Sequence, residues 1–136
     1  MDISKVMLIS ASGMSAQTMR LRTIAENLAN ADSLGETPGA NPYARKTVTF
    51  KNVMDKSLGA NTVKVDKINK DPSAFQKRFD PQHPAADKDG YVLTPNVNSL
   101  IELMDMRQAQ RSYEANLSVI EVSKTMVSRT IDLLRG

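Results

Sequence analysis

The stretch DPQHPAADKDGYVLTPNVN, residues 80–98, contains the residue types best suited to bind a metal ion. Three aspartates and one histidine lie close together there. These are Asp80, His83, Asp87 and Asp89. Carboxylate and imidazole groups at such short spacing are ligands for calcium or zinc, and a bound metal ion can activate water for hydrolysis. The stretch therefore has to be tested first as a metal centre.

The spacing of these residues does not fit the known metal-binding patterns. A calcium-binding EF-hand loop needs oxygen ligands at its first, third and fifth positions, glycine at the sixth and glutamate at the twelfth. With Gly90 at the sixth position, Ala85 and Asn96 occupy the first and twelfth. A zinc site needs more histidine or cysteine than this chain has, with one histidine and no cysteine. Asp89 followed by glycine is typical of a tight turn before a strand. We therefore predict a turn, with no metal and no cofactor.

Other catalytic patterns give no positive signal. The sequence has no phosphate-binding loop, no dinucleotide-binding glycine pattern and no nucleophile elbow. A single histidine leaves little from which to build a nucleophile and base pair, and the lack of cysteine excludes disulfides and thiolate chemistry. Two carboxylates that meet in space stay open as an alternative, as does a metal-dependent enzyme built on residues 80–89. We expect a protein that is not an enzyme.

Both ends of the chain carry the periodicity of amphipathic helices. Near the N-terminus, apolar residues recur every seven positions, and Gly35 with Pro38 would stop that helix. Near the C-terminus, apolar residues recur at steps of three and four. Ser99 and Glu102 fit a capping box at the start of that helix. Nothing breaks it before Gly136, so it would run about 37 residues, or about 55 Å.

The middle of the chain indicates short strands. Runs with β-forming residues lie at 46–50, 62–68 and 91–94, separated by turn-forming residues. Five of the six aromatic residues lie in the middle, which predicts a small aromatic core. The fold class is therefore α+β, mainly α, with long N- and C-terminal amphipathic helices forming a coiled-coil-like hairpin. We expect an N-terminal helix at 1–32, an exposed linker at 33–44, a small β-rich domain at 45–96 and a C-terminal helix at 97–136.

One pair of such helices cannot cover both apolar rows, so we expect the rows to pack against other subunits. The alternative is burial within the same chain. Two asparagines near the end of the first helix are candidates for polar, register-setting contacts, or else lie on a solvated face. Until they assemble, helices with such weak seams should be partly disordered. The predicted packing residues are Met7, Met14, Leu21, Ile24, Asn27, Leu28, Asn30, Leu103, Met106, Tyr113, Leu117, Ile120, Val127, Ile131 and Leu134.

The net charge of +3 is unevenly distributed. Residues 41–78 contain nine Lys or Arg against three Asp. A small basic nucleic-acid-binding module is therefore an alternative, but the aromatic residues are not interleaved with the basic ones as stacking platforms. We interpret the basic middle as a solvated surface. No apolar run is long enough to span a membrane, and the start lacks the basic and apolar pattern of a cleaved signal peptide.

Three segments resemble one family of bacterial proteins. SASGMSAQTMRLRTIAENLANADS (residues 10–33) is similar to the N-terminal signature of the flagellar rod and hook proteins, in which an A-x-N-L-A-N element ends the first helix. RSYEANLSVI (residues 111–120) resembles their C-terminal helix. DPSAFQKRFDPQHPAADKDGYVLTPNVN (residues 71–98) resembles, within that family, a protein of the proximal rod.

The resemblance implies a structural subunit of the flagellar basal body. Such a subunit would polymerise through its terminal helices, as the inner layer of the proximal rod, and transmit torque across the periplasm for motility. Its partners would be copies of itself, the rod proteins FlgB, FlgF and FlgG, and the rod-base adaptor FliE. The flagellar type III export apparatus would carry it unfolded, without a cleaved signal peptide. Neither nucleic-acid binding nor direct membrane insertion is expected.

Overall fold

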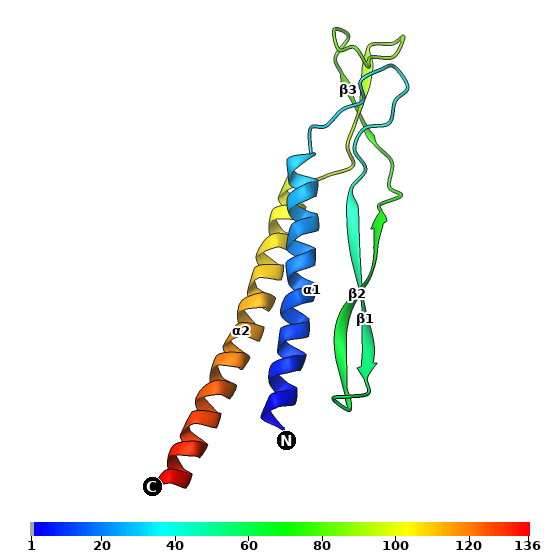
Figure 1. The fold of residues 1–136 in the computed structure, drawn as a ribbon. Helices are drawn as coiled ribbons and strands as arrows, with labels where there is room; N and C mark the ends of the chain where they lie inside the picture. Colours follow the sequence, from blue (N-terminus) through cyan, green and yellow to red (C-terminus); the bar gives the residue numbers. More distant parts are fainter. Residues whose placement is uncertain (1) are drawn as a thin grey trace.

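Two long helices and two small antiparallel sheets make up the computed structural model, which describes residues 2–136. Figure 1 shows an elongated molecule in which helix α1 lies between helix α2 and the β1–β2 hairpin, with strands β3 and β4 at one end. The predicted α+β class is confirmed. Of the predicted N-terminal segment 1–32, Met1 lies outside the described residues. The elements are α1 (Ile3–Ala29), β1 (Lys46–Asp55), β2 (Ala60–Lys70), β3 (Gln76–Phe79), β4 (Tyr91–Thr94) and α2 (Ser99–Arg135).

Side chains at both ends of α1 satisfy its free backbone groups. The Asp2 carboxylate accepts a hydrogen bond of 3.0 Å from the backbone N–H of Ser4. At the other end the backbone N–H and the side-chain amide of Asn30 both donate to the carbonyl of Glu26. Because this cap completes the last turn, the helix ends before the predicted stop at Gly35.

Helix α2 has the predicted length of 37 residues but not the predicted cap. The Asn98 side chain is the N-cap and accepts hydrogen bonds from the backbone N–H groups of Leu100 and Ile101. The predicted capping box of Ser99 and Glu102 is wrong, because the Glu102 carboxylate is buried and binds groups outside the helix. Asparagine and serine are both strong N-cap residues, so the choice between neighbours rests on the tertiary contacts of the glutamate.

The two helices run antiparallel, but a coiled-coil-like apolar seam between them is not confirmed. Two rows of α2 residues are buried or half-buried at seven-residue spacing. One row is small or polar and consists of Glu102, Ala109, Asn116 and Ser123, and the other is apolar and half-buried and consists of Met106, Tyr113, Ile120 and Val127. A Cβ added to Gly13 on α1 would lie 2.9 Å from the side-chain nitrogen of Asn116, so the helices approach closely there. The seven-residue spacing therefore exists, with small and polar residues in the more deeply buried of its two rows.

The β1–β2 hairpin lies along α1, and both strands are longer than predicted. Its register runs from Lys46 opposite Lys70 to Asp55 opposite Ala60, with a bulge between Thr49 and Phe50. On α1, the Ser12 hydroxyl accepts a hydrogen bond of 3.3 Å from the backbone N–H of Val63. An isolated two-stranded ribbon is marginally stable in water. Its packing on α1 is therefore part of what holds the hairpin in place.

The remaining strands form a separate small sheet, which pairs Gln76 with Thr94 and Phe79 with Tyr91. Strand β3 was not predicted. The aromatic core was also predicted wrongly, because Phe79 is 64% exposed and Tyr91 is exposed as well. The two rings meet edge to face, with centroids 5.3 Å apart, while the buried side chains nearby are Ala85 and Val92. A two-stranded sheet is too small to enclose large rings.

The linker predicted to be exposed is packed in part. Pro42 is buried, and the backbone N–H of Tyr43 donates to the carbonyl of Ser33 across the loop. The segment therefore folds back on itself between α1 and β1.

The close approach of the helices gives a first test. Ala109 is fully buried in α2, so Ala109→Leu should force the helices apart and lower the free energy of unfolding by about 1–3 kcal/mol. Ala115→Leu makes the same change at an exposed position of α2 and should change it by no more than about 0.5 kcal/mol. Thermal unfolding followed by circular dichroism measures both. Equal effects would show that α1 does not pack closely on Ala109.

Candidate functional site: a polar junction and an exposed helical surface

A single arginine links the two helices to the middle of the chain. Arg45 immediately precedes β1, and its Nε donates a hydrogen bond to Oε1 of Glu102, a residue with no exposed surface. Its Nη1 lies 3.2 Å from Oδ2 of Asp71, and its Nη2 lies 3.5 Å from Oδ2 of Asp105. One guanidinium thus contacts two carboxylates from α2 and one that directly follows β2. We call Arg45, Glu102, Asp71, Asp105 and Asn27 the polar junction.

Asn27 is the most fully bonded side chain of the polar junction and is 1% exposed. Its amide nitrogen donates to the carbonyl of Lys46 at 2.9 Å and to Oε2 of Glu102 at 3.1 Å. Its oxygen accepts from the backbone N–H of Lys46 and from the hydroxyl of Tyr43, both at 2.9 Å. All four hydrogen-bonding positions of the amide are therefore filled within the chain. They hold α1, α2 and the start of β1 in one relative position.

The polar junction extends to the loops beside β3 and β4 through Asn96. Its oxygen accepts a hydrogen bond of 2.7 Å from the backbone N–H of Arg45. Its nitrogen donates to the carbonyl of Asp71 at 3.2 Å and to that of Ser73 at 3.0 Å. The segment that leads into α2 is thereby tied to the segment that leaves β2.

The surroundings of Arg45, Lys46 and Glu26 favour the charged form of each side chain. Burial lowers the pKa of Arg45, but hydrogen bonds and charge from Glu102 and Asp71 more than reverse this, so the pKa lies above its usual value. At the surface, the hydrogen bond between Lys46 and Glu26 raises the pKa of the lysine and lowers that of the carboxyl. Arg45 and Lys46 therefore stay protonated, and Glu26 ionised, at neutral pH. Fixed charges suit a structural contact better than proton transfer.

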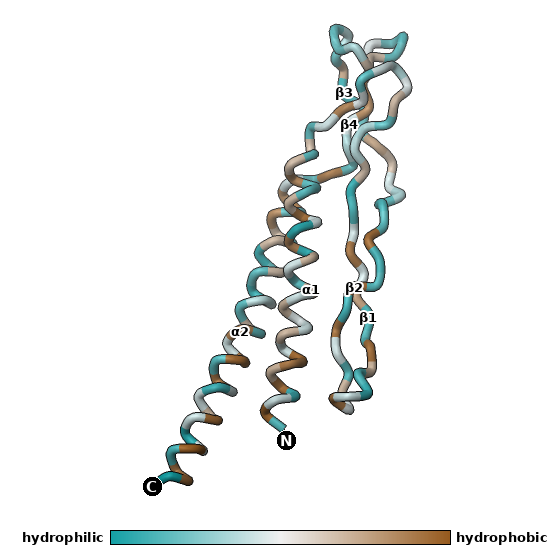
Figure 2. The backbone as a smooth tube through the Cα atoms, viewed as in Figure 1, coloured by the Kyte–Doolittle hydropathy of each residue, from teal (hydrophilic) through white to brown (hydrophobic). Residues whose placement is uncertain are grey.

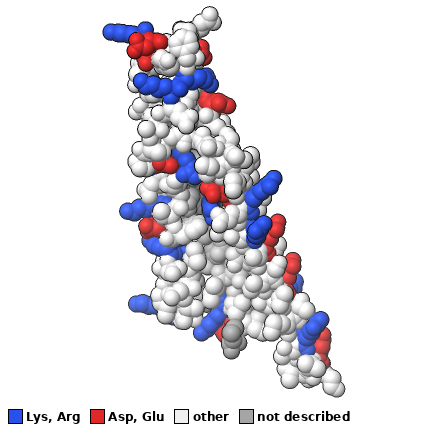
Figure 3. Space-filling model, turned by 180° about the vertical axis from the view of Figure 1, so that it is seen from behind, with Lys and Arg blue, Asp and Glu red and all other residues white. Residues whose placement is uncertain are grey.

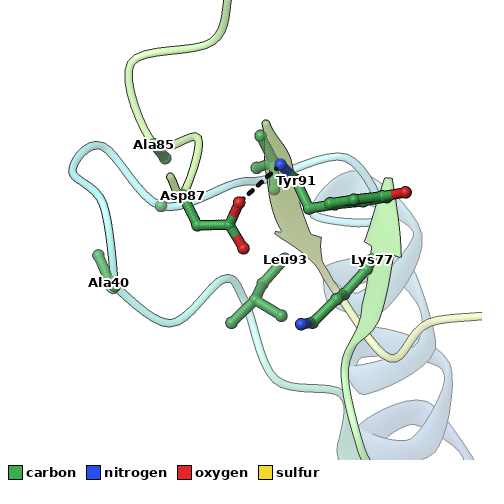
Figure 4. A pocket seen from close by; sticks show the side chains of 9 residues that line it. Ala40, Lys77, Ala85, Asp87, Tyr91 and Leu93 are labelled. Carbon is green, nitrogen blue, oxygen red and sulfur yellow. Dashed lines mark hydrogen bonds between the residues drawn. The ribbon is translucent and has the colours of Figure 1, made fainter. Parts of the chain in front are cut away.

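Residues 80–90, which contain the three aspartates and the histidine, form turns. Oδ1 of Asp87 accepts hydrogen bonds from the backbone N–H groups of Asp89 and Tyr91, at 3.0 and 2.8 Å. Figure 4 shows the bond to Tyr91. Gly90 has a φ of 81°, and the His83 ring accepts from the backbone of Ala85. The predicted turn is confirmed. Within residues 2–136, no three acidic, histidine or cysteine side chains converge as they would around a metal ion.

The cleft in Figure 4 lies beside these turns, between the loop that contains Ala40 and the β3–β4 sheet. Its volume is about 200 Å³. Pockets that hold small-molecule ligands usually have about 300–1,000 Å³, so this cleft is small for such a role. In the described part of the chain, neither helix combines the length and apolar character required to cross a membrane.

The predicted packing residues fall into three groups in the structure. Ile24 and Asn27 are buried within the chain, and the contacts of Asn27 are complete there. Four on α2 are exposed, namely Leu103, Leu117, Ile131 and Leu134. The half-buried ones are Met7, Met14, Leu21, Leu28, Asn30, Met106, Tyr113, Ile120 and Val127. Asn30 bonds to Glu26 and Ser33, so both asparagines are engaged within the chain.

Sequence reasoning missed a second exposed apolar stripe on α2. Figure 2 shows apolar residues on the turns near its C-terminal end, alternating with polar ones. The signal was present only in part, as steps of three and four residues between Ile101 and Met104 and along Val119, Val122 and Met126, and the longer first series masked it. The additional exposed apolar residues of α2 are Leu100, Ile101, Met104, Val119, Val122, Met126 and Leu133.

Basic side chains gather on the hairpin. Residues 46–70 contain six lysines and two aspartates. Lys46 forms an ion pair with Glu26 on α1, and Lys51 forms one with Asp66. Figure 3 shows Lys and Arg side chains projecting along the edge that the hairpin forms, with broad uncharged areas between charges elsewhere.

Comparison with known proteins places these features in a family. Two family models match, "Flagella basal body rod protein" at residues 7–35 and "Flagellar basal body rod FlgEFG protein C-terminal" at residues 88–133. The flagellar basal-body rod protein FlgC of Agrobacterium fabrum is 52% identical over 128 residues, which cover 94% of this chain and 92% of that protein. The chain belongs to the FlgC family of flagellar basal-body rod proteins.

More distant FlgC proteins match over nearly the same length. That of Aquifex aeolicus is 40% identical, covering 97% of both chains. That of Bacillus subtilis is 34% identical, covering 92% of this chain and 93% of its own. The first family model covers most of α1, and the second covers β4 and nearly all of α2. The predicted family is therefore confirmed.

The buried ion pair between Arg45 and Glu102 in this FlgC-family chain can be tested by substitution. Glu102→Gln removes the buried charge that faces Arg45, while Asp71 and Asp105 stay beside the guanidinium. Removing one partner of a buried ion pair leaves the other charge uncompensated. The free energy of unfolding, measured by urea denaturation, should therefore fall by about 2–3 kcal/mol. Glu121→Gln, at an exposed position of the same helix, should leave it within about 0.5 kcal/mol. A variant at position 102 as stable as the control would refute the role of this pair.

Acid should weaken the polar junction through Asp71. Hydrogen bonds from Ser73, followed by those from Arg45, hold the pKa of Asp71 below its usual value of 3.8. The ionised Asp71 carboxylate therefore stabilises the folded chain at every pH above its unfolded-state pKa of about 4. This stabilisation is lost as the pH falls through the lower pKa of the folded state. As the pH falls below about 4, the free energy of unfolding should fall less steeply in Asp71→Asn than in the unaltered chain. The control variant Asp89→Asn, in an exposed turn, should show the same dependence of unfolding free energy on pH as the unaltered chain. Urea denaturation at a series of pH values measures all three proteins.

Proposed function

We propose that this chain is a structural subunit of the flagellar basal-body proximal rod and polymerises through its terminal helices. The observation that carries the proposal is the exposed apolar surface of the 37-residue helix α2, which lies in two stretches, at residues 100–104 and 117–134. Exposed apolar patches of this extent mark surfaces that bind other proteins. In a chain of the FlgC family, the partners are other rod subunits.

The inter-subunit surface uses the exposed and half-buried members of the predicted packing set. Leu103, Leu117, Ile131 and Leu134 supply large side chains on α2, and the second stripe adds Val119, Val122 and Met126. On α1, Leu21 and Leu28 keep part of their surface available. Asn27 is left out of this surface because its hydrogen bonds are complete within the chain.

The neighbours in this proposal are copies of the chain, FlgB, FlgF and FlgG, with FliE at the base of the rod. Torque reaches the helices and the middle of the chain together, because the polar junction joins them. The absence of cysteine suits a chain that is exported unfolded by the flagellar type III apparatus into an oxidising compartment. Its place is the rod that spans the periplasm, and it acts without catalysis.

Amide hydrogen exchange on the purified chain, and on the same chain within isolated basal bodies, tests this function. In the free chain, residues 124–135 should exchange freely, because every one of them except Val127 is exposed. Residues 102–123, which pack on α1, should be protected to a greater degree. In basal bodies the whole helix should be protected. The expected slowing at residues 124–135 is at least tenfold.

Two outcomes would contradict this function. Unchanged exchange at residues 124–135 in basal bodies would mean that the exposed surface of α2 meets no neighbour. Failure to find the chain in basal bodies that contain FlgB and FlgG would remove it from the rod altogether. The β3–β4 sheet serves as the internal reference, because its exchange should change least between the two samples.

A further inference from the structure

A groove opens where the β1–β2 hairpin meets the segments that lead to the rest of the chain. The last bond of the ladder is a hydrogen bond of 2.7 Å from the backbone N–H of Asp71 to the carbonyl of Arg45. Pro72 follows directly, and Pro42 lies on the other segment. Because proline has no N–H to donate, it ends a ladder. Among the described residues, no backbone hydrogen bond joins the two segments beyond that point, where Figure 1 shows them running towards the β3–β4 sheet.

The groove has the size and lining of a small-molecule site. It lies between residues 41–46 and 70–75, and its volume is about 520 Å³. Sites that hold small molecules usually have about 300–1,000 Å³. Tyr43 and Phe75 line it, and both side chains are half-buried. The Tyr43 hydroxyl donates a hydrogen bond to Asn27 in the polar junction, which holds the ring in place. The groove therefore offers preformed aromatic surface.

Two lysines that line the groove lie opposite each other on the ladder. Lys46 pairs in register with Lys70, an arrangement in which like charges repel. Glu26 neutralises Lys46 through an ion pair of 2.9 Å. Lys70 is exposed, and no carboxylate among residues 2–136 forms an ion pair with it. The groove therefore presents an unbalanced positive charge, which a bound anion would neutralise.

The polar side chains of the groove suit a ligand that carries hydroxyl and amide groups. Asn41 and Ser73 line it on opposite segments, and both are exposed. Their amide and hydroxyl groups can donate and accept hydrogen bonds. Asp71 also lines the groove, but its carboxylate already binds Arg45 and the backbone N–H of Ser73. A sugar fits this combination, because its C–H face packs on an aromatic ring while its polar groups form hydrogen bonds.

Two other classes of ligand fit less well. A peptide that added a strand would need backbone N–H donors along the groove, and Pro42 and Pro72 supply none. A phosphate group is typically bound by arginine forks or by the N-terminus of a helix. Neither an arginine nor a helix residue lines this groove. The single unpaired lysine matches a ligand with one carboxylate.

We propose that the groove between residues 41–46 and 70–75 binds a sugar that carries one carboxylate. The sugar ring packs on Tyr43 and Phe75, and its carboxylate lies beside Lys70. This inference goes beyond the proposed function, because it rests on the groove and not on the helices.

Titration of the purified, ¹⁵N-labelled full chain with two sugars, followed by NMR, tests the groove. N-acetylmuramic acid, the carboxylated sugar of the bacterial cell wall, has a lactyl carboxylate where N-acetylglucosamine has a hydroxyl. The acid should shift the amide signals of residues 41–46 and 70–75, with a dissociation constant that is roughly millimolar. The neutral sugar should bind at the same place about three- to fivefold more weakly, because it lacks one solvent-exposed ion pair.

Variants of the chain assign the two parts of the ligand. Lys70→Gln should lower the affinity for the acid to that for the neutral sugar, whose own affinity should not change. Lys67→Gln removes the same charge from an exposed position three residues earlier on β2 and should change neither affinity. Phe75→Leu keeps an apolar side chain without the aromatic face and should weaken the binding of both sugars severalfold. Urea denaturation of each variant separates loss of binding from loss of folding.

Three results would overturn this inference. The first is that tens of millimolar of the acid cause no shifts in the groove. The second is an equal loss of affinity in Lys70→Gln and Lys67→Gln, which would show a general attraction of carboxylates to the basic hairpin. The third is stronger binding of an acetylated Ala-Glu-Ala amide, which would make the occupant a peptide. None of them affects the rod function, which hydrogen exchange in basal bodies tests separately.

Discussion

Glu102 has no exposed surface at the point where α1, α2 and the start of β1 meet, so its charge must be balanced there. A buried carboxylate without a partner costs several kcal/mol, and Arg45 together with Asn27 removes that cost. Because Glu102, Arg45 and Asn27 come from three different segments, none of the segments can shift without exposing or isolating the charge. The positions of the helices and of the hairpin depend on this one group.

Small residues lie where the two helices approach each other closely. Gly13 and Ala109 let the two helices approach closely, so the most buried row of α2 consists of small and polar residues. Many of the large apolar side chains of α2 lie on its outer faces and are exposed in the single chain. This distribution differs from that of a stable two-helix hairpin, in which leucine fills the seam. It leaves much of the apolar surface of α2 exposed.

The sequence was informative wherever structure is decided locally. The length of α2 could be predicted because its periodicity is uninterrupted, and the turn at Asp89–Gly90 because glycine at positive φ has few alternatives. Residues whose roles depend on tertiary contacts could not be assigned. Glu102 three positions after Ser99 fits a capping box as well as it fits a buried ion pair, and only the position of Arg45 decides between them.

The same limit applies to the sheets and to the seam. Strand β3, with the sequence QKRF, has all four residues exposed and so carries no apolar alternation to reveal it. Ala109 and Ser123 resemble surface residues in the sequence because nothing in their type indicates burial. The second stripe on α2 was detectable by its spacing, but a helix with apolar residues on several faces does not show which face its neighbour will cover.

The geometry around Arg45 has a mechanical consequence. Its three carboxylate partners belong to two segments and meet different edges of one planar guanidinium. A single hydrogen bond resists displacement mainly along its own axis, whereas contacts spread around a plane are stretched by displacement in several directions. Asn27 and Asn96 add further bonds close by. A load applied to the β3–β4 end therefore meets a stiff joint before it reaches the helices, and the molecule responds to bending and twisting as one body.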